Sequence, residues 1–229
     1  MEDTIAAIST STMSSGGISI VRMSGNNALD IADKVFKSKK GVKLSQVKSH
    51  TIHYGNIYNK DELIDEVLVA VMKSPNTYTR EDVVEINCHG GILVTRKVLE
   101  TLLEYGARPA EPGEFTKRAF LNGRIDLSQA EAVIEVINSK NEYALKSSVN
   151  QLDGKLSKKI KDIRDILIED VAFIEAALDD PEHISLDNFV DKLEKNVDNC
   201  VDNVDNLLKT SDNGKIIKDG IRTVILGKT

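Results

Sequence analysis

The chain has 229 residues, of which 41% are hydrophobic and 29% charged, and its net charge is −6. This length suits one large or two modest globular domains. No apolar run reaches the roughly 20 residues of a membrane span, and no targeting segment opens the chain. We therefore expect a cytoplasmic protein. The acidic balance disfavours a nucleic-acid binder that uses its whole surface, and two distant cysteines, Cys88 and Cys200, argue against a disulfide framework or a metal site.

Up to about residue 110 the chain alternates between short strand-like and helix-like segments. Residues 4–8 and 17–23 are predicted strands, separated by the flexible stretch 14–17. Residues 26–36 are a predicted helix with an Asn cap, because apolar residues recur along one face.

Further strands and a helix follow in the same part of the chain. Residues 50–58 and 63–72 alternate or run apolar around a polar connection, a pattern typical of a hairpin. Residues 82–87 predict another strand, and residues 92–105 predict a helix that stops at Gly106. Strands mixed with helices in this order predict an α/β or α+β domain around one sheet.

Residues 111–132 are the most informative stretch. They combine a turn, a short helix, a glycine break at Gly123 and a second helix, which Asp126 caps and which runs to about residue 138. A generic helical linker lacks this combination. Helical periodicity dominates from here, because no proline lies between Pro112 and Pro181.

Two longer helical segments follow. Residues 142–178 predict one long or once-broken helix, and Gly154 is the expected point of bending. Residues 186–208 repeat the same apolar pattern. Together these segments predict an all-α partial helix bundle, whose broad apolar faces need more chain or a second subunit to cover them.

Two charged residues interrupt apolar strands. Arg22 and Glu85 have apolar neighbours, and a charge there costs desolvation free energy unless it meets an opposite charge or hydrogen-bond partners. Arg22 could anchor a carboxylate, and Glu85 could accept the two parallel N–H groups of a 2-amino-pyrimidinone ring, as in a pterin or guanine. The alternating pattern alone favours the other interpretation, in which both charges face solvent.

The other candidate motifs carry weaker signals. His89-Gly-Gly lies between a strand and a helix, where backbone amides can hold an anion, but ordinary turn formation explains the glycines equally well. Arg118 and Arg124 flank Asn122-Gly123, and their pattern alone makes them surface charges. No residue is predicted to be catalytic.

The C-terminal Gly227-Lys-Thr229 does not complete a nucleotide-binding motif, because the Walker pattern requires glycine where Arg222 stands. In the better register, residues 222–226 are the first strand of a GTPase and Gly227 begins its phosphate loop. The lysine, the magnesium-binding hydroxyl and the switches of such a domain are not in the chain. We therefore expect no GTP hydrolysis by this chain alone.

Five segments of the chain are distinctive when taken together: Thr4-Ile-Ala-Ala-Ile-Ser, Gly16-Gly-Ile-Ser-Ile-Val-Arg-Met-Ser-Gly25, Tyr78-Thr-Arg-Glu-Asp-Val-Val-Glu-Ile-Asn-Cys-His-Gly-Gly91, the stretch 111–132 and Phe173-Ile-Glu-Ala-Ala-Leu-Asp-Asp180. They carry a resemblance, along essentially the whole chain, to the MnmE (TrmE) family of bacterial tRNA-modification GTPases. It implies a folate-binding-like α+β domain with a mixed sheet over residues 1–118, an incomplete helical domain over residues 119–215, and the start of a GTPase domain over residues 216–229.

The resemblance also implies a function. In this family the N-terminal domain binds a tetrahydrofolate one-carbon donor, in its 5-formyl or methylene form, and makes the homodimer. The family's folate contacts fall on Arg22, Glu85 and Arg124, with Glu85 accepting from the pterin ring and the arginines countering a carboxylate or a one-carbon oxygen. With its partner MnmG, the family modifies the wobble uridine of certain tRNAs by a carboxymethylaminomethyl group at C5. GTP, K⁺ and Mg²⁺ belong to the full-length parent.

The chain departs from the family pattern at three points. Cys88 stands where glycine is expected, Thr229 stands where the family has proline, and the family's C-terminal Cys-x-Gly-Lys end is absent. Two alternative interpretations remain. A free-standing folate-dependent transferase, resembling the glycine-cleavage aminomethyltransferase, would need its own catalytic acid and leaves the long helices unexplained. A helical scaffold predicts no ligand.

Overall fold

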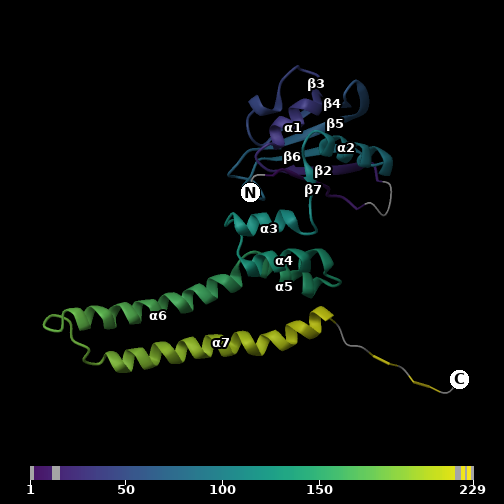
Figure 1. Cartoon of the computed structure of the whole chain (residues 1–229). Coiled ribbons are helices and arrows are strands. Elements are labelled where there is room, and N and C mark those ends of the chain that lie inside the picture. Colours follow the sequence, from purple (N-terminus) through teal and green to yellow (C-terminus); the bar gives the residue numbers. More distant parts are fainter. Residues whose placement is uncertain (1–2, 12–15, 220–222, 225, 228–229) are drawn as a thin grey trace. The chain divides into compact units, whose positions relative to one another are not determined.

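The computed structural model describes residues 3–11, 16–219, 223–224 and 226–227 (Figure 1). The chain divides into two compact units, residues 1–125 and residues 126–229. The boundary proposed from the sequence, after residue 118, falls within the helix α3 (Glu114–Leu121) of the first unit.

The first unit is built on a seven-stranded mixed sheet with the order β3-β4-β5-β6-β2-β1-β7. All neighbouring strands are antiparallel except the pair β1 and β7, which is parallel. The predicted α+β class with a mixed sheet is confirmed. The strands are β1 (Ile5–Ile8), β2 (Ile18–Ser24), β3 (Phe36–Ser38), β4 (Thr51–Asn59), β5 (Glu62–Met72), β6 (Val83–His89) and β7 (Arg108–Pro109).

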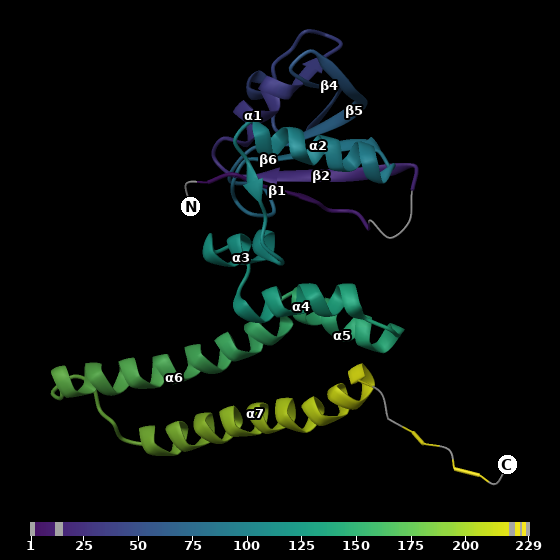
Figure 2. The ribbon, with the colours of Figure 1, turned by 45° about the vertical axis from the view of Figure 1, so that its right-hand side comes forward.

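The helices α1 (Ala28–Val35) and α2 (Ile92–Glu104) pack against one face of this sheet and against each other (Figures 1 and 2). Alternate residues of the central strands point at these helices and exclude water, which supplies the main stabilisation of the unit. A short 3-10 helix, η1 (Leu44–Gln46), adds to the same layer. The buried core includes Val21, Met23, Val35, Ile57, Val69, Val71, Val84, Ile86, Val98 and Leu102.

Local signals explain several element ends in this unit. The hairpin of β4 and β5 forms around the polar connection, as predicted, and Gly106 ends the α2 region at a φ of +114°, which side chains other than glycine rarely adopt. The predicted Asn cap of α1 is confirmed in position only. Asn27 occupies the cap position without a side-chain cap bond, and its backbone N–H instead donates to Oγ1 of Thr4 at 3.0 Å.

The second unit consists of the helices α4 (Leu127–Asn138), α5 (Glu142–Leu152), α6 (Lys155–Asp179) and α7 (Phe189–Asp219). Asp126 caps α4 through a capping box with Gln129, as the sequence predicts for a helix start. The long helical segment is broken once, at Gly154, whose φ is +79°. The structure therefore confirms an all-α region that follows the sheet domain.

Side-chain amides tie α4 to α5. Nε2 of Gln129 donates to the Leu152 carbonyl at 2.8 Å, and Nε2 of Gln151 donates to the Ser128 carbonyl at 2.9 Å. The first bond satisfies the last carbonyl of α5, which has no donor within its own helix, and the second ties the end of α5 to the first turn of α4. They also hold the helix break at Gly154 in place.

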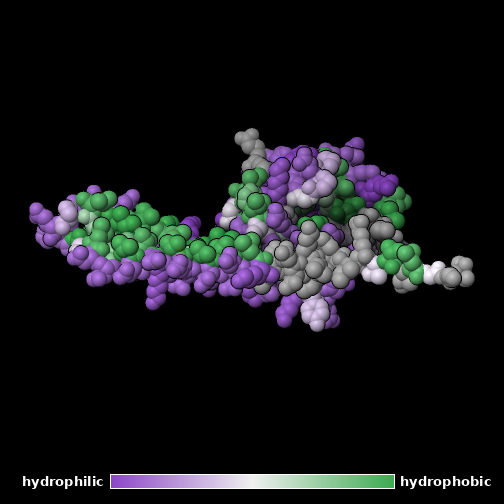
Figure 3. Space-filling model, turned by 90° about the horizontal axis from the view of Figure 1, so that it is seen from below, coloured by the Kyte–Doolittle hydropathy of each residue, from purple (hydrophilic) through white to green (hydrophobic). Residues whose placement is uncertain are grey.

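The rings of Phe173 on α6 and Phe189 on α7 stack with their centroids 4.6 Å apart. Along this pair of helices a band of apolar side chains reaches the surface (Figure 3). A groove of about 470 Å³ follows α6, where Ile160, Leu167, Ile168 and Val171 are exposed. The predicted broad apolar faces are therefore present in this unit.

No helix among the described residues is long and apolar enough to cross a membrane. The strand predicted over residues 222–226 includes residues 222 and 225, which lie outside the described residues, so that prediction stays untested.

Candidate functional site

Arg22 and Glu85 lie directly opposite each other on β2 and β6. Nε of Arg22 donates to Oε1 of Glu85 at 2.7 Å, and Nη2 lies 2.7 Å from the same oxygen. Their side chains are 31% and 21% exposed, so neither is the freely solvated charge that alternation alone favours. Among the described residues, Oε2 of Glu85 accepts no hydrogen bond, and this oxygen can take a donor from a ligand.

This ion pair lies on the face of the sheet opposite α1 and α2. Ala70 of β5 is paired with Glu85, and Ala7 of β1 is paired with Arg22, so small side chains flank the two charges in one row across the sheet. Both alanines are half-buried. Phe115 of α3 closes one side, since its ring centroid lies 5.6 Å from Cζ of Arg22.

Tyr78 brings the third predicted residue to the same place. Its ring centroid is 6.0 Å from Cζ of Arg22 and 4.8 Å from Cζ of Arg124. Its hydroxyl is 2.9 Å from Oγ1 of Thr116 on α3. The structure thus gathers Arg22, Glu85 and Arg124 around one aromatic ring, although they are far apart in sequence.

Arg124 reaches this ring because the chain reverses after α3. Gly123 has a φ of +68°, and the backbone N–H of Arg124 donates to the Ala119 carbonyl at 2.9 Å. Arg124 is exposed, and no carboxylate of the described residues lies within ion-pair distance of its guanidinium. It therefore retains donors and a full charge for an anionic group.

Arg118 does not lie at the surface, where the sequence pattern predicted it. It is fully buried, not a surface charge, and it lies at the centre of a network of carboxylates. Its guanidinium is 2.8 Å from Oδ1 of Asp3, 3.0 Å from Oε1 of Glu81 and 3.1 Å from Oε1 of Glu114. Nothing local in the sequence signals this burial, because Asp3 and Glu81 come from distant segments. The network holds α3 against the sheet.

Glu114 is the most perturbed acid of this network. Its side chain is 3% exposed and accepts bonds from Nη1 and Nη2 of Arg108 at 2.9 and 2.5 Å. These bonds from Arg108, opposed by burial and assisted by the Glu111 amide, lower the pKa of Glu114 to about 2. Arg108 also bonds Asp3 and lowers the pKa of that carboxyl. Both acids thus act as structural anions.

The segment that carries Tyr78 is pinned on both sides. Oγ1 of Thr79 is 2.7 Å from Oγ of Ser24, and the Ser24 hydroxyl donates to Oε2 of Glu81 at 2.7 Å. Oγ1 of Thr77 donates to the Glu81 carbonyl at 2.7 Å. Because all four of these partners are buried, their bonds are shielded from water and stabilise the loop that carries Tyr78.

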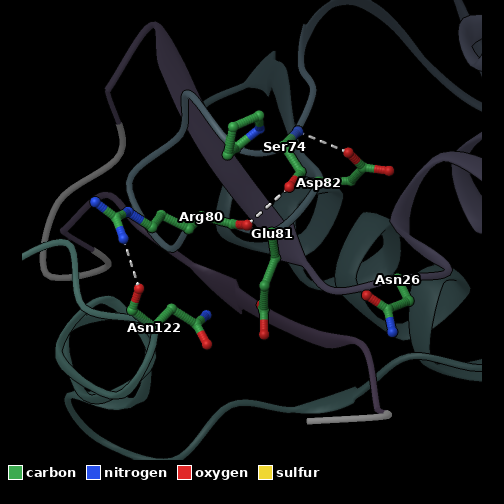
Figure 4. Close-up of a pocket in the computed structure, with 7 residues that line it drawn as sticks. Asn26, Ser74, Arg80, Glu81, Asp82 and Asn122 are labelled. Atoms are coloured by element: carbon green, nitrogen blue, oxygen red, sulfur yellow. Dashed lines mark hydrogen bonds between the residues drawn. The ribbon is translucent and has the colours of Figure 1, made fainter.

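The outer side of the same loop borders a polar pocket of about 480 Å³. In Figure 4 the Arg80 side chain reaches Asn122, where Nη1 donates to the Asn122 carbonyl at 2.9 Å. Oδ1 of Asp82 accepts from the Ser74 amide at 2.9 Å. The Arg80 bond connects the loop to the end of α3, and the Asp82 bond closes the loop on itself. The lining residues are Asn26, Ser74, Pro75, Arg80, Glu81, Asp82 and Asn122.

His89 is paired with Asp65. Its Nδ1 lies 2.7 Å from Oδ1 of Asp65, and its backbone N–H donates to Oδ2 at 2.8 Å. Cys88 is a buried thiol, and burial raises its pKa. Among the described residues, no group of three or more His, Cys, Asp or Glu side chains could hold a metal ion.

Comparison with known proteins identifies the chain. Residues 4–124 match the family model for the GTP-binding protein TrmE N-terminus, and residues 127–224 match the model for the MnmE helical domain. The chain belongs to the MnmE family. The tRNA modification GTPase MnmE of Lachnoclostridium phytofermentans is 60% identical over 227 residues, which are 99% of this chain and 49% of that protein.

Other MnmE relatives also match the chain along its whole length. The tRNA modification GTPases MnmE of Bacillus subtilis and Clostridioides difficile are 50% identical over 229 residues and 49% identical over 235 residues. These alignments cover 99% and 100% of the chain, and 50% of each relative. The chain therefore spans about half the length of the relatives it matches.

The MnmE matches follow the division of the structure. The N-terminal match ends at residue 124 and the helical match begins at residue 127, and the two compact units meet between residues 125 and 126. Arg22, Tyr78, Glu85 and Arg124 all lie within the N-terminal match. The candidate site thus belongs to one MnmE domain.

Proposed function

We propose that this chain forms the folate-binding and helical portions of an MnmE-type tRNA-modification GTPase. Its N-terminal unit binds a tetrahydrofolate derivative, in the 5-formyl or methylene form, through Arg22, Glu85 and Arg124. The observation that carries the proposal is the convergence of these three residues around Tyr78. When bound, the folate supplies a one-carbon unit.

The donor and acceptor groups present fit such a ligand. The 2-amino and ring N–H groups of a pterin are neighbouring donors, and Glu85 is a carboxylate with one oxygen free of hydrogen bonds among the described residues. Arg124 has no carboxylate partner in the described part of the chain, and it can counter a folate carboxylate or a one-carbon oxygen. The site thus offers an acceptor for one end of the ligand and cations for the other.

The wider function follows the MnmE relatives. We propose that the whole protein, a GTP hydrolase that uses K⁺ and Mg²⁺, acts with MnmG in the cytoplasm to place a carboxymethylaminomethyl group at C5 of the wobble uridine in certain tRNAs. The chain dimerises through its N-terminal unit. The two portions described here bind folate and assemble, and we assign no catalytic residue to them. The match of residues 127–224 to the MnmE helical domain favours this function over a free-standing aminomethyltransferase-like protein.

Calorimetric titration with 5-formyltetrahydrofolate tests the role of Arg124. We expect Arg124→Gln to weaken binding by about 10- to 100-fold, the usual loss for a charge-assisted hydrogen bond. Lys117→Gln is a matched control, because it removes one positive charge from an exposed position on α3. Equal losses in the two variants would contradict a specific role for Arg124.

Sedimentation of the purified chain tests dimerisation separately. The proposal predicts a species with twice the mass of the 25.2 kDa chain. A monomer over a wide range of protein concentration would contradict it, and would leave the folate proposal to the titration.

A further inference from the structure

We propose that Tyr78 is a positioning residue of the folate site, which holds Arg22 and Arg124 at one fixed place for the anionic part of the ligand. This inference rests on the proposed folate function. It adds a residue that neither the sequence motifs nor the family comparison assigns, and it gives that residue a physical task.

The first support is the position of the ring between two cations. Cζ of Arg124 lies 4.8 Å from the Tyr78 ring centroid, and Cζ of Arg22 lies 6.0 Å from it. Both distances are within the range of cation–π attraction. Two guanidinium groups repel each other, so a shared aromatic ring offsets part of the cost of placing them together.

The second support is the fixed position of the ring itself. The Tyr78 hydroxyl is 2.9 Å from Oγ1 of Thr116, which ties the ring to α3. Thr79 is fully buried and bonds Ser24 on one side, while its carbonyl accepts from Nδ2 of Asn122 at 2.6 Å. The ring therefore cannot rotate away without breaking its bond to Thr116, and bonds of Thr79 hold the backbone beside it to β2 and to the end of α3.

The third support is that the two arginines differ in their other contacts. Arg22 is bonded to Glu85, so its direction is already set from one side. Arg124 is exposed and has no carboxylate partner among the described residues, and the Tyr78 ring is the contact that orients its guanidinium. Tyr78 thus acts mainly through Arg124, and the loss of the ring leaves a long side chain free to sample many rotamers.

A double-mutant cycle in the whole chain, titrated with 5-formyltetrahydrofolate, tests this coupling. We expect Tyr78→Leu to weaken binding about tenfold, Arg124→Gln to weaken it by about 10- to 100-fold as above, and the double variant to be little weaker than the worse single variant. Tyr78→Phe keeps the ring and should bind within about threefold of wild type. Additive losses, or wild-type affinity in Tyr78→Leu, would overturn the inference.

A second measurement stands even if Tyr78→Leu does not fold. The chain has no tryptophan, so Tyr78→Trp introduces a single indole that preserves the aromatic face. We expect this variant to bind 5-formyltetrahydrofolate with a saturable change in indole emission. Tyr143→Trp, at a position 75% exposed in the second unit, is the control and should show no saturable change.

The outcomes separate the inference from the function on which it rests. If the folded wild-type chain takes up no folate, the proposed function fails and this inference fails with it. If wild type binds and the indole emission of Tyr78→Trp stays unchanged, only the role of Tyr78 is overturned.

Discussion

The guanidinium of Arg118 lies 3.0 Å from the carboxylate of Glu81, and the arginine side chain is fully buried. This pair joins α3 to the segment before β6, two parts of the chain that contribute Arg124 and Tyr78 to the candidate site. Glu114 and Asp3 complete the charge balance around the same arginine. The network is therefore a structural support for the site and not a binding group.

Arg118→Met should be strongly destabilising. It removes the cation that balances Glu81, whereas Glu114 and Asp3 keep their bonds to Arg108, so we expect a loss of about 3 kcal/mol in the free energy of unfolding. Urea denaturation at neutral pH measures this loss. Arg164→Met is the control, because that side chain is 62% exposed and should change stability by less than about 0.5 kcal/mol. Similar midpoints for both variants would contradict the network.

The low pKa of Glu114 predicts that the protein loses stability in acid. Its pKa falls from 4.5 in the unfolded chain to about 2 in the fold, so its contribution is fully present above pH 4.5 and disappears as the pH falls from 4.5 to 2. The full contribution is of the order of 3 kcal/mol. Glu114→Gln should therefore flatten the pH dependence of the unfolding free energy in this window. Glu111→Gln, at a position 68% exposed, should keep the wild-type slope, and two equal slopes would refute the assignment.

Arg22→Ala should separate binding from stability. Its ion pair with Glu85 is partly exposed, so we expect a change of about 1 kcal/mol or less in the free energy of unfolding. Binding of 5-formyltetrahydrofolate should weaken at least about tenfold, because a charge-assisted contact is lost. Thermal melting and calorimetry on one preparation measure both. A large fall in stability with unchanged affinity would make Arg22 a structural residue.

Gly55 tests the packing at the edge of the sheet. A Cβ atom at this position would lie 2.4 Å from the Lys37 carbonyl and 2.6 Å from the Phe36 ring, so Gly55→Ala should cost about 2 kcal/mol or more. Gly17→Ala is the matched control, because no atom of the described residues, apart from Gly17 and its two chain neighbours, lies within 4 Å of its added Cβ. We expect its unfolding midpoint in urea to stay close to wild type. Equal shifts for the two variants would show that the predicted clash relaxes without cost.

Much of the fold could be predicted from local patterns. Apolar patterns predicted the strands β2, β4, β5 and β6. The helix cap at Asp126 and the break at Gly154 also lie where the sequence predicts them. The strands β3 and β7 were missed because they are 3 and 2 residues long, too short for any periodicity to register. Their existence depends on pairing with distant strands.

The site could be predicted only in part. Arg22 and Glu85 could be predicted as candidate site residues, because charges in apolar strands need partners. In the structure each is the other's partner. Tyr78 and Thr116 gave no such signal, since their roles arise from contacts between segments that are far apart in sequence. The burial of Arg118 was missed for the same reason, because Asp3 and Glu81 reach it only in the fold.

The most direct test of the account is calorimetric titration of the wild-type chain and of Glu85→Ala with 5-formyltetrahydrofolate. Wild type should show one saturable site per chain, and Glu85→Ala should bind at least about tenfold more weakly, with both proteins equally folded by circular dichroism. Unchanged affinity in Glu85→Ala, or no uptake of folate by the folded wild-type chain, would contradict it.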